Sequence, residues 1–231
     1  MKDGRKLQKA PAKRKHRKVI GNGKIFLKET EFSIMIDLER DCEMLTLSNE
    51  QAISSFNCGN DDLNDFFNHD AIQYKNQMLS RPYFFRLKNS DIIICAFSFS
   101  ASSIKTSDLP GSRRKKVKEY VPREKSLKSY PAALIGRLGV ATDFNGQGMG
   151  SQLIKAIKNI CLFQFPDFLR FILVDAYNEP AVIGFYQKND FALVFSTEEQ
   201  EKETYRQMQS EPLQTRYMFY DMMQWRNKII E

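Results

Sequence analysis

The chain has 231 residues, 42% of them hydrophobic, and a formal net charge of +7. This length and apolar content suffice for a full hydrophobic core. No run of about 18 apolar residues occurs and no apolar signal segment follows the charged N-terminus, so we expect neither a membrane-spanning helix nor a secretory signal. Cys42, Cys58, Cys95 and Cys161 form no CxxC pair, which predicts reduced thiols, no metal site and a cytoplasmic protein.

The positive charge belongs to two segments. Residues 1–28 contain 11 Lys or Arg residues and one acid, which leaves 24 basic and 27 acidic residues in the rest of the chain. Such a polar tail buries too little apolar surface to order itself, so residues 1–34 are predicted to be a disordered arm. Residues 105–129 form a basic insertion, with nine basic and three acidic residues between Lys105 and Lys128. Both segments suit contact with RNA phosphates, and for both a solvated surface is the alternative.

Residues 35–231 are predicted to form one domain, whose first half contains strands and one helix. Residues 43–47 have the pattern of a short strand, and residues 60–76 place apolar side chains on one face of a helix capped by Asn60. The runs RPYFFRLK and DIIICAFSFS, separated by the turn NSD, predict an antiparallel hairpin. Residues 132–141 predict a longer strand.

The second half alternates helices and strands. Residues 151–163 have the apolar spacing of a helix, and residues 168–176 are almost continuously apolar, as in a strand covered on both faces. Residues 178–188 predict a short helix capped by Asn178. The runs FALVF and TRYMFYDM predict strands on either side of a charged insertion at residues 196–214. This order of elements favours an α+β protein with a mixed sheet.

A glycine-rich turn joins the strand at 132–141 to the next helix. In VATDFNGQGMG, glycines at 146, 148 and 150 remove side chains where a strand ends and a helix begins. Backbone N–H groups at a helix N-terminus lack an intrahelical partner and favour a negatively charged ligand, so the turn suits a pyrophosphate. The motif GxxxxGK[ST] is absent and the spacing is not GxGxxG, which disfavours nucleotide hydrolysis and NAD binding.

Several segments together resemble a known family. VATDFNGQGMG and the downstream NEPA and FYQKNDF resemble the two cofactor motifs of the GCN5-related N-acetyltransferases, the GNAT family. FNCGNDDLNDFF and RLGV resemble in particular its toxin-type branch, which acetylates aminoacyl-tRNA. The resemblance implies the GNAT fold, a mixed, mostly antiparallel sheet splayed in a V and flanked by helices. It also implies acetyl-CoA as cosubstrate, an amine acceptor such as aminoacyl-tRNA, a homodimer and an antitoxin as partners, and no membrane association.

The resemblance assigns roles to residues of this chain. Backbone groups of Leu138 and Val140 would pair with the pantetheine arm, and the N–H of Val140, or that of its neighbour, would stabilise the oxyanion. Tyr186 would be the general acid for the departing thiolate. The cofactor-binding set comprises Leu138, Gly139, Val140, Asn145, Gly146, Gln147, Gly148, Met149, Gly150, Ser151 and Asn178.

Two positions depart from the family pattern. Asn145 stands where the family has Arg or Gln, which leaves the backbone to hold the pyrophosphate at that point. Asp190 replaces a glycine that often adopts a left-handed conformation, so we expect a small strain there.

The sequence offers no histidine suited to be a general base. His16 lies in the basic tail and His69 on the polar side of a predicted helix. An α-amine, with a pKa of about 8, needs less help to lose a proton than a lysine amine, with a pKa of about 10.4. The absence of such a histidine is therefore consistent with aminoacyl-tRNA as the acceptor.

Three functions remain open at this point. The favoured one is acetyl-CoA-dependent N-acetyl transfer by direct attack of a primary amine, with the α-amine of aminoacyl-tRNA as acceptor. The second is the same transfer to a protein or small-molecule amine, with the basic segments incidental. The third is a non-catalytic acyl-CoA-binding or RNA-binding module.

Overall fold

The computed structural model describes residues 19–21, 24–26, 34–47, 56–107, 111, 114–115, 127–206 and 210–230. The chain divides into two units, residues 1–36 and 37–231. The first unit contains a small antiparallel sheet that the sequence analysis did not predict, formed by β1 (Val19–Gly21), β2 (Lys24–Phe26) and β3 (Ile34–Met35). The rest of the predicted disordered arm lies outside the described residues.

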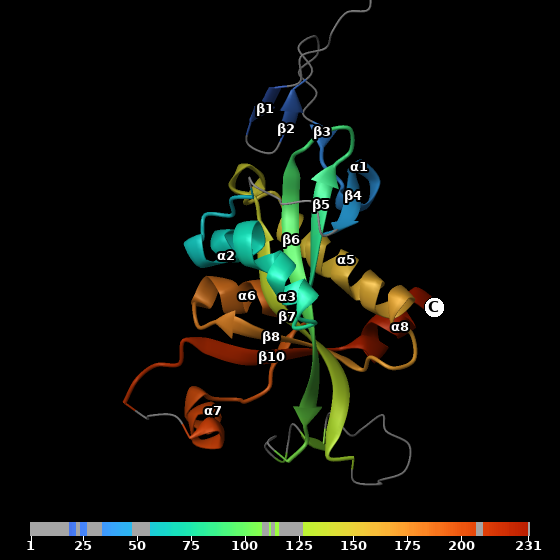
Figure 1. The fold of residues 1–231 in the computed structure, drawn as a ribbon. Coiled ribbons are helices and arrows are strands. Elements are labelled where there is room, and N and C mark those ends of the chain that lie inside the picture. The colour runs from blue at the N-terminus through green and yellow to red at the C-terminus, as the bar shows by residue number, and fades with distance from the viewer. Residues whose placement is uncertain are drawn as a thin grey trace, which may run out of the picture. The chain divides into compact units, whose positions relative to one another are not determined.

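A seven-stranded sheet forms the centre of the second unit (Figure 1), in the order β4-β5-β6-β7-β8-β10-β9. Neighbouring strands are antiparallel except β7 and β8, which are parallel. The strands are β4 (Cys42–Thr46), β5 (Arg81–Leu87), β6 (Ile93–Lys105), β7 (Ser129–Val140), β8 (Phe171–Tyr177), β9 (Ala192–Leu193) and β10 (Thr215–Asp221). The predicted mixed, mostly antiparallel sheet is confirmed.

The sheet opens between β7 and β8. Residues 132–135 of β7 pair with residues 171–174 of β8, and beyond these pairs β7 continues along β6 only and β8 along β10 only. A β-bulge lies where the pairing of β7 with β8 ends. Ser98 of β6 pairs with Arg137 of β7 and Phe99 pairs with Ile135, so Gly136 between them has no partner on β6. We call this point, where β7 and β8 separate, the fork. It produces the predicted V.

Helices flank this sheet. They are α1 (Leu38–Asp41), α2 (Asp61–Asp65), the π-helical turn η1 (Phe66–Asp70), α3 (Ala71–Asn76), the 3-10 turn η2 (Thr142–Phe144), α5 (Met149–Gln164), α6 (Pro180–Lys188), α7 (Glu198–Tyr205) and α8 (Met222–Ile230). Asn60 caps α2 as predicted, since its Oδ1 accepts from the Leu63 N–H at 3.0 Å. Within the described residues, no helix is both long enough and apolar enough to cross a membrane.

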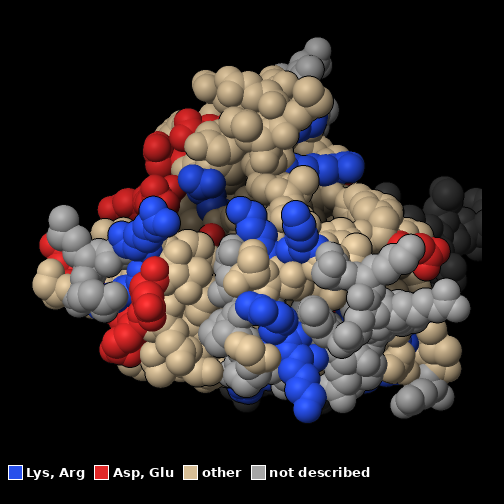
Figure 2. Space-filling model, turned by 90° about the horizontal axis from the view of Figure 1, so that it is seen from below, with Lys and Arg blue, Asp and Glu red and all other residues tan. Residues whose placement is uncertain are grey.

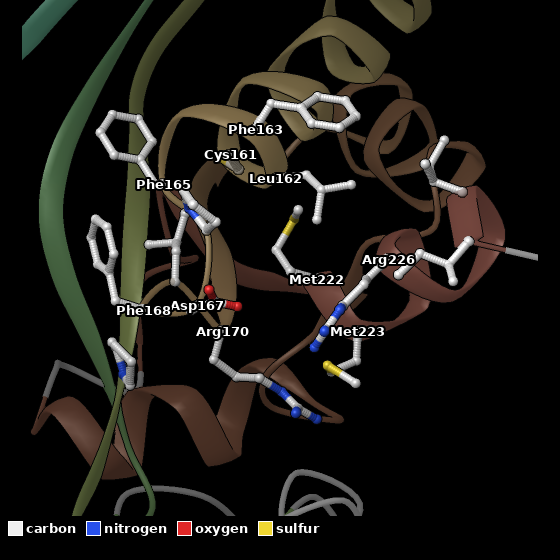
Figure 3. A pocket seen from close by; sticks show the side chains of 15 residues that line it. Cys161, Leu162, Phe163, Phe165, Asp167, Phe168, Arg170, Met222, Met223 and Arg226 are labelled. Atoms are coloured by element: carbon white, nitrogen blue, oxygen red, sulfur yellow. The ribbon is translucent and has the colours of Figure 1, made fainter.

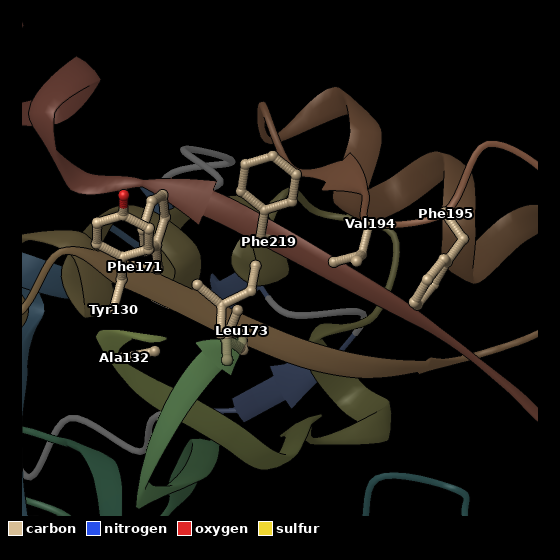
Figure 4. Close-up of a cluster of buried hydrophobic side chains, with 8 residues drawn as sticks. Tyr130, Ala132, Phe171, Leu173, Val194, Phe195 and Phe219 are labelled. Carbon is tan, nitrogen blue, oxygen red and sulfur yellow. The ribbon is translucent and has the colours of Figure 1, made fainter. Parts of the chain in front are cut away.

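Two clusters of buried side chains lie on one face of the sheet. The first, beneath α2 and α3, includes Phe67, Phe84 and Ala96. The second, drawn in Figure 4, consists of Ile104, Tyr130, Ala132, Phe171, Leu173, Val194, Phe195 and Phe219. Ala96 and Ile104 are separated by an even number of positions on β6, so their side chains point to the same face. We call it the α2 face.

Two local predictions are wrong. The helix at 178–188 is not capped by Asn178: Glu179 is its N-cap, without a side-chain cap hydrogen bond, and Pro180 is its first residue. The predicted strand FALVF is only two residues long, Ala192–Leu193. The Val194 N–H still donates to the Tyr217 carbonyl of β10 at 2.9 Å, but the side chains of Val194 and Phe195 belong to the second cluster and Thr197 then caps α7. Asp190 has a φ of +69°, the left-handed conformation expected there.

Candidate active site

The three glycines of the turn have two different structural roles. Gly146 and Gly148 have φ angles of +74° and +79°, a left-handed conformation that glycine adopts without steric cost, and an added Cβ would meet open space. Gly150 is not left-handed, but a Cβ there would lie 2.9 Å from Cε2 of Phe185 on α6. The first two glycines therefore shape the turn, and Gly150 lets α5 and α6 approach closely.

The turn ends at an uncapped helix N-terminus. Gly148 is the N-cap of α5, and no side chain caps this helix. The first turn closes with the Gln152 N–H donating to the Gly148 carbonyl at 3.1 Å. The N–H groups of Met149, Gly150 and Ser151 therefore have no partner within the helix. Together with the helix dipole, these donors favour an anionic ligand such as a pyrophosphate.

Beyond the fork, β7 has a free backbone edge. The Ala141 N–H donates to the Ile94 carbonyl, next to β6, at 2.8 Å. Because successive residues of a strand direct their N–H and C=O groups to opposite edges, those of Leu138 and Val140 point away from β6. β8 has separated from β7 here, so no described strand receives them. An extended ligand with amide groups can bind this edge as an additional strand.

A cavity of about 540 Å³ joins the helix N-terminus to the strand edge. Of the eleven predicted cofactor residues, nine line it: Leu138, Gly139, Val140, Asn145, Gly146, Gly148, Met149, Gly150 and Ser151. The spacing of the glycines predicted the part of this lining at the turn, and the family resemblance added Leu138, Gly139 and Val140 of the strand. The other two, Gln147 and Asn178, lie outside the lining.

Part of the cavity lining comes from other elements and was not predicted from the sequence. Leu63 lies on α2, Asn60 is its N-cap, and Cys58 precedes it, whereas Gly184, Phe185 and Lys188 come from α6. All six fall in or beside the segments that carried the family resemblance, which was the signal available. Lys188 brings a positive charge to the cavity, where it can offset the missing arginine at Asn145.

Tyr186 lies in the interior beside the cavity, and the lining does not include it. The side chain is 6% exposed and packs edge-on against Phe185 and Phe191, with ring centroids 5.0 and 5.4 Å away. Burial raises the pKa of the Tyr186 hydroxyl, which keeps this group protonated at neutral pH. Its role as general acid stays a prediction.

Gln147 and Asn178 bind other parts of the protein. The Gln147 amide donates to the Asp143 carbonyl at 3.1 Å and so closes the glycine turn. The Asn178 amide donates to Oε2 of Glu198 and to the Leu213 carbonyl, both at 3.0 Å. Asn178 thereby ties the end of β8 to α7 and to the segment before β10. These contacts are structural, and the predicted cofactor contacts of the two residues stay predictions.

Basic side chains gather at the end of the β6–β7 hairpin. Lys105, Arg114, Lys115 and Lys128 are exposed there. Figure 2 looks onto this end and has Lys and Arg side chains across the middle of the face, with most acidic side chains toward its left. Much of the basic insertion at 105–129 lies outside the described residues. The described part suits contact with a polyanion.

Another cavity, of about 450 Å³, lies at the opposite end of α5 (Figure 3). Its lining is largely apolar and includes Phe165, Phe168 and Met222, with Arg226 on the side opposite the two phenylalanines. The 16 residues of α5 separate it from the glycine turn by about 24 Å, at about 1.5 Å per residue. None of the predicted site residues lines it, so it is distinct from the cavity at the glycine turn.

Residues 118–193 match the acetyltransferase (GNAT) domain family. This part of the chain has the sequence pattern of a GNAT acetyltransferase domain. The matched segment runs from the basic insertion through β7, α5, β8 and α6 to β9, and it includes every predicted site residue. The predicted family and enzyme class are therefore confirmed.

The fold as a whole is similar to solved structures of AtaT and KacT. A complex of AtaT with acetyl-methionyl-tRNAfMet is 18% identical, with a TM-score of 0.63 over 82% of this chain and 99% of that chain. A KacT variant is 15% identical, with a TM-score of 0.59 over 82% and 99%. An AtaT variant bound to the C-terminus of the antitoxin AtaR and to acetyl-CoA is 15% identical, with a TM-score of 0.58 over 83% and 99%. At these identities the likeness establishes the fold.

Proposed function

We propose that this GNAT protein transfers the acetyl group of acetyl-CoA to the α-amine of aminoacyl-tRNA. The observation that carries the proposal is the cavity between the N-terminus of α5 and the free edge of β7. One end offers unpaired N–H groups to a pyrophosphate, and the other offers a strand edge to the amides of pantetheine. The same fold occurs in AtaT, which has been solved with acetyl-methionyl-tRNAfMet and with acetyl-CoA, and this supports the assignment.

In the proposed reaction the amine attacks the thioester directly, and groups of the chain stabilise the transition state. The amine nitrogen bonds to the thioester carbon, the C–S bond breaks, and no covalent enzyme intermediate forms. A pantetheine arm that starts at α5 runs back along β7 toward the fork. The N–H of Leu138, which is nearer the fork than that of Val140, is therefore the better candidate for the oxyanion donor. The buried Tyr186 hydroxyl remains protonated and is our candidate donor to the departing sulfur.

Acceptor binding is assigned to the basic hairpin end. Lys105, Arg114, Lys115 and Lys128 form an exposed basic surface that can rest on phosphates without reading a base sequence. Such contacts hold the tRNA and leave the choice of aminoacyl group to residues near the fork.

A label-transfer experiment tests the proposal. Radiolabelled acetyl-CoA is offered with charged total tRNA, uncharged tRNA or cell protein in separate reactions. We expect label only with charged tRNA, and its release when mild base hydrolyses the aminoacyl ester. Label in the protein fraction would instead favour a protein amine as acceptor.

A charge-removing pair of substitutions then tests the tRNA surface. The double variant Arg114→Gln/Lys115→Gln should raise the KM for charged tRNA and lower the salt dependence of log KM by about 0.7 to 0.9 for each phosphate that the variant no longer neutralises. The KM for acetyl-CoA should not change. Lys155→Gln, an exposed lysine on α5 paired with Glu39, is the matched control. An equal effect of the control would show that only net charge matters.

A further inference from the structure

We propose that the cavity between β8, α7 and the segment before β10 binds the ammonium group of the acceptor, and that Asp175 accepts its proton. The inference rests on the proposed acetyl transfer and names the residue that activates the amine. The cavity has a volume of about 750 Å³. Asp175, Glu201, Tyr205, Glu211 and residues 212–215 contribute to its lining.

Asp175 stands at the fork. It directly follows Val174, the last residue of β8 that pairs with β7. Its side chain points to the α2 face, because Leu173, two positions earlier on the same strand, points there too. Tyr217 of β10 is its cross-strand partner. The strand edge that we assign to pantetheine begins at the same fork, on β7. An amine held by Asp175 therefore lies beside the opening toward which the thioester points.

Three carboxylates line this cavity, those of Asp175, Glu201 and the exposed Glu211, and they differ in their partners. Glu201 is 3% exposed and accepts from Nε of Arg216 and from the Tyr217 N–H, each at 2.7 Å. The carboxylate of Asp175 makes no hydrogen bond or ion pair with the described residues, and solvent reaches it. Surrounding protein still raises the pKa of Asp175 through loss of solvation. An arriving ammonium gives this carboxylate the charge-assisted hydrogen bond that it lacks.

The groups around Asp175 leave the cavity negative. The titratable and charged groups that surround Asp175 come from three elements. Glu201, Tyr205 and Arg206 lie on α7 or at its end, Glu211 lies in the segment before β10, and Tyr217 lies on β10. Burial, and then the charge of Asp175, raise the pKa of Tyr217 to about 12, so Tyr217 is neutral. Glu201 is compensated by Arg216, and the exposed Arg206 and Glu211 oppose one another in sign. The uncompensated charge is that of Asp175.

The walls of the cavity are fixed from outside it. Asn178 donates to both Glu198 and the Leu213 carbonyl, and the Leu213 N–H donates to Oε1 of Glu198 at 2.7 Å. These bonds hold α7 and the segment before β10 against the end of β8. The cavity therefore does not depend on a ligand for its shape.

The proton balance of the step assigns two protons. The ammonium gives its first proton to the Asp175 carboxylate, which releases it to solvent through the cavity, and the nitrogen lone pair attacks the thioester carbon. The C–S bond breaks with its electron pair on sulfur. Tyr186 gives the sulfur its proton, and the second proton that the nitrogen loses returns to Tyr186. The products are the acetylated amine, the CoA thiol and one free proton.

The test compares Asp175→Asn with the wild type at two pH values, with charged tRNA as the acceptor. At pH 7 only about a tenth of an α-amine with a pKa of about 8 is neutral, so a variant that must use the neutral amine should lose about 10-fold in kcat/KM for the acceptor. At pH 9 the amine is already neutral, and the loss should shrink to less than about fivefold. Acetyl-CoA binding should stay unchanged. Glu211→Gln removes the same charge from the same cavity and should have little effect.

The outcomes separate this inference from the proposed function. An equal loss at both pH values would make Asp175 a structural residue, and a faster Asp175→Asn enzyme would make it a repulsive charge for tRNA; either result overturns the inference alone. If the wild type acetylates another amine and not charged tRNA, the proposed acceptor is wrong and the same pH comparison is made with that amine. If it acetylates no amine, both proposals are wrong.

Discussion

Substitution of Gly148 by alanine tests whether the left-handed turn holds the N-terminus of α5 in its binding geometry. Gly148 has a φ of +79°, and a Cβ there would contact nothing within 4 Å. The cost is therefore purely conformational, roughly 1–2 kcal/mol for a residue with a Cβ in this region. The lower end of that range corresponds to about a fivefold shift in the folding equilibrium, at an RT of about 0.6 kcal/mol.

Urea unfolding and calorimetric titration with acetyl-CoA measure the two consequences of Gly148→Ala. We expect the free energy of unfolding to fall by about 1 kcal/mol, and acetyl-CoA to bind several-fold more weakly because the turn relaxes away from the anion. Gly148→Asn is the matched control, because asparagine tolerates the left-handed region better and should lose less on both scales. The reasoning is refuted if alanine is as stable as glycine, or if asparagine is no better than alanine.

Gly150→Ala should behave differently although it lies only two residues away. Alanine is the better helix former by roughly 1 kcal/mol, but its Cβ would lie 2.9 Å from the Phe185 ring. We expect net destabilisation, and relief of it in the double variant with Phe185→Leu, which removes the contacting ring atoms. Additive effects of the two substitutions would contradict the role assigned to Gly150.

Three further predictions concern α5 and α6. Lys158 is 3% exposed, and chiefly this burial lowers its pKa to about 8. Because the unfolded chain binds the proton more tightly, the free energy of unfolding should rise between about pH 8 and 10.4. Urea titrations of Lys158→Met should not show this rise. Tyr186→Phe should lower kcat about 10²-fold without changing the Kd of acetyl-CoA, and an unchanged kcat would remove its acid role. Lys188→Gln should weaken acetyl-CoA binding about fivefold at low salt, an effect that should fade at high salt, whereas Lys155→Gln should not.

Local patterns in the sequence were sufficient for most elements of the domain. Strands and helices with strong apolar spacing, such as β8 and α5, lie within a few residues of their predicted positions. α8 was missed because MMQWRNKII follows β10 without a turn or capping signal, so nothing in the local pattern marks the change. The π-helical turn between α2 and α3 was missed because the apolar residues at 63, 66, 67, 71 and 74 have the spacing of one continuous α-helix.

The two sites differed in how far the sequence could predict them. The glycine turn and its flanking strand are contiguous, so their spacing and the family resemblance located most of the cavity lining. The Asp175 cavity is assembled from β8, α7 and the segment before β10, and only folding brings these together. Hydropathy also misled here: Glu201 and Lys202 are buried inside a segment predicted as a charged insertion, because Arg216 and Glu198 neutralise them.

One departure from regular pairing produces both parts of the proposed active site. If β7 and β8 remained paired to their ends, β8 would occupy the edge that carries the N–H groups of Leu138 and Val140, and the pantetheine arm would have no strand to bind. The same pairing would bring β7 beside Asp175 at the end of β8, where the strands now lie apart. The bulge at Gly136 lies where the two strands begin to separate. A variant that deletes Gly136 and restores the register should therefore lose acetyl-CoA binding and acceptor turnover together, even where the rest of the sheet remains folded.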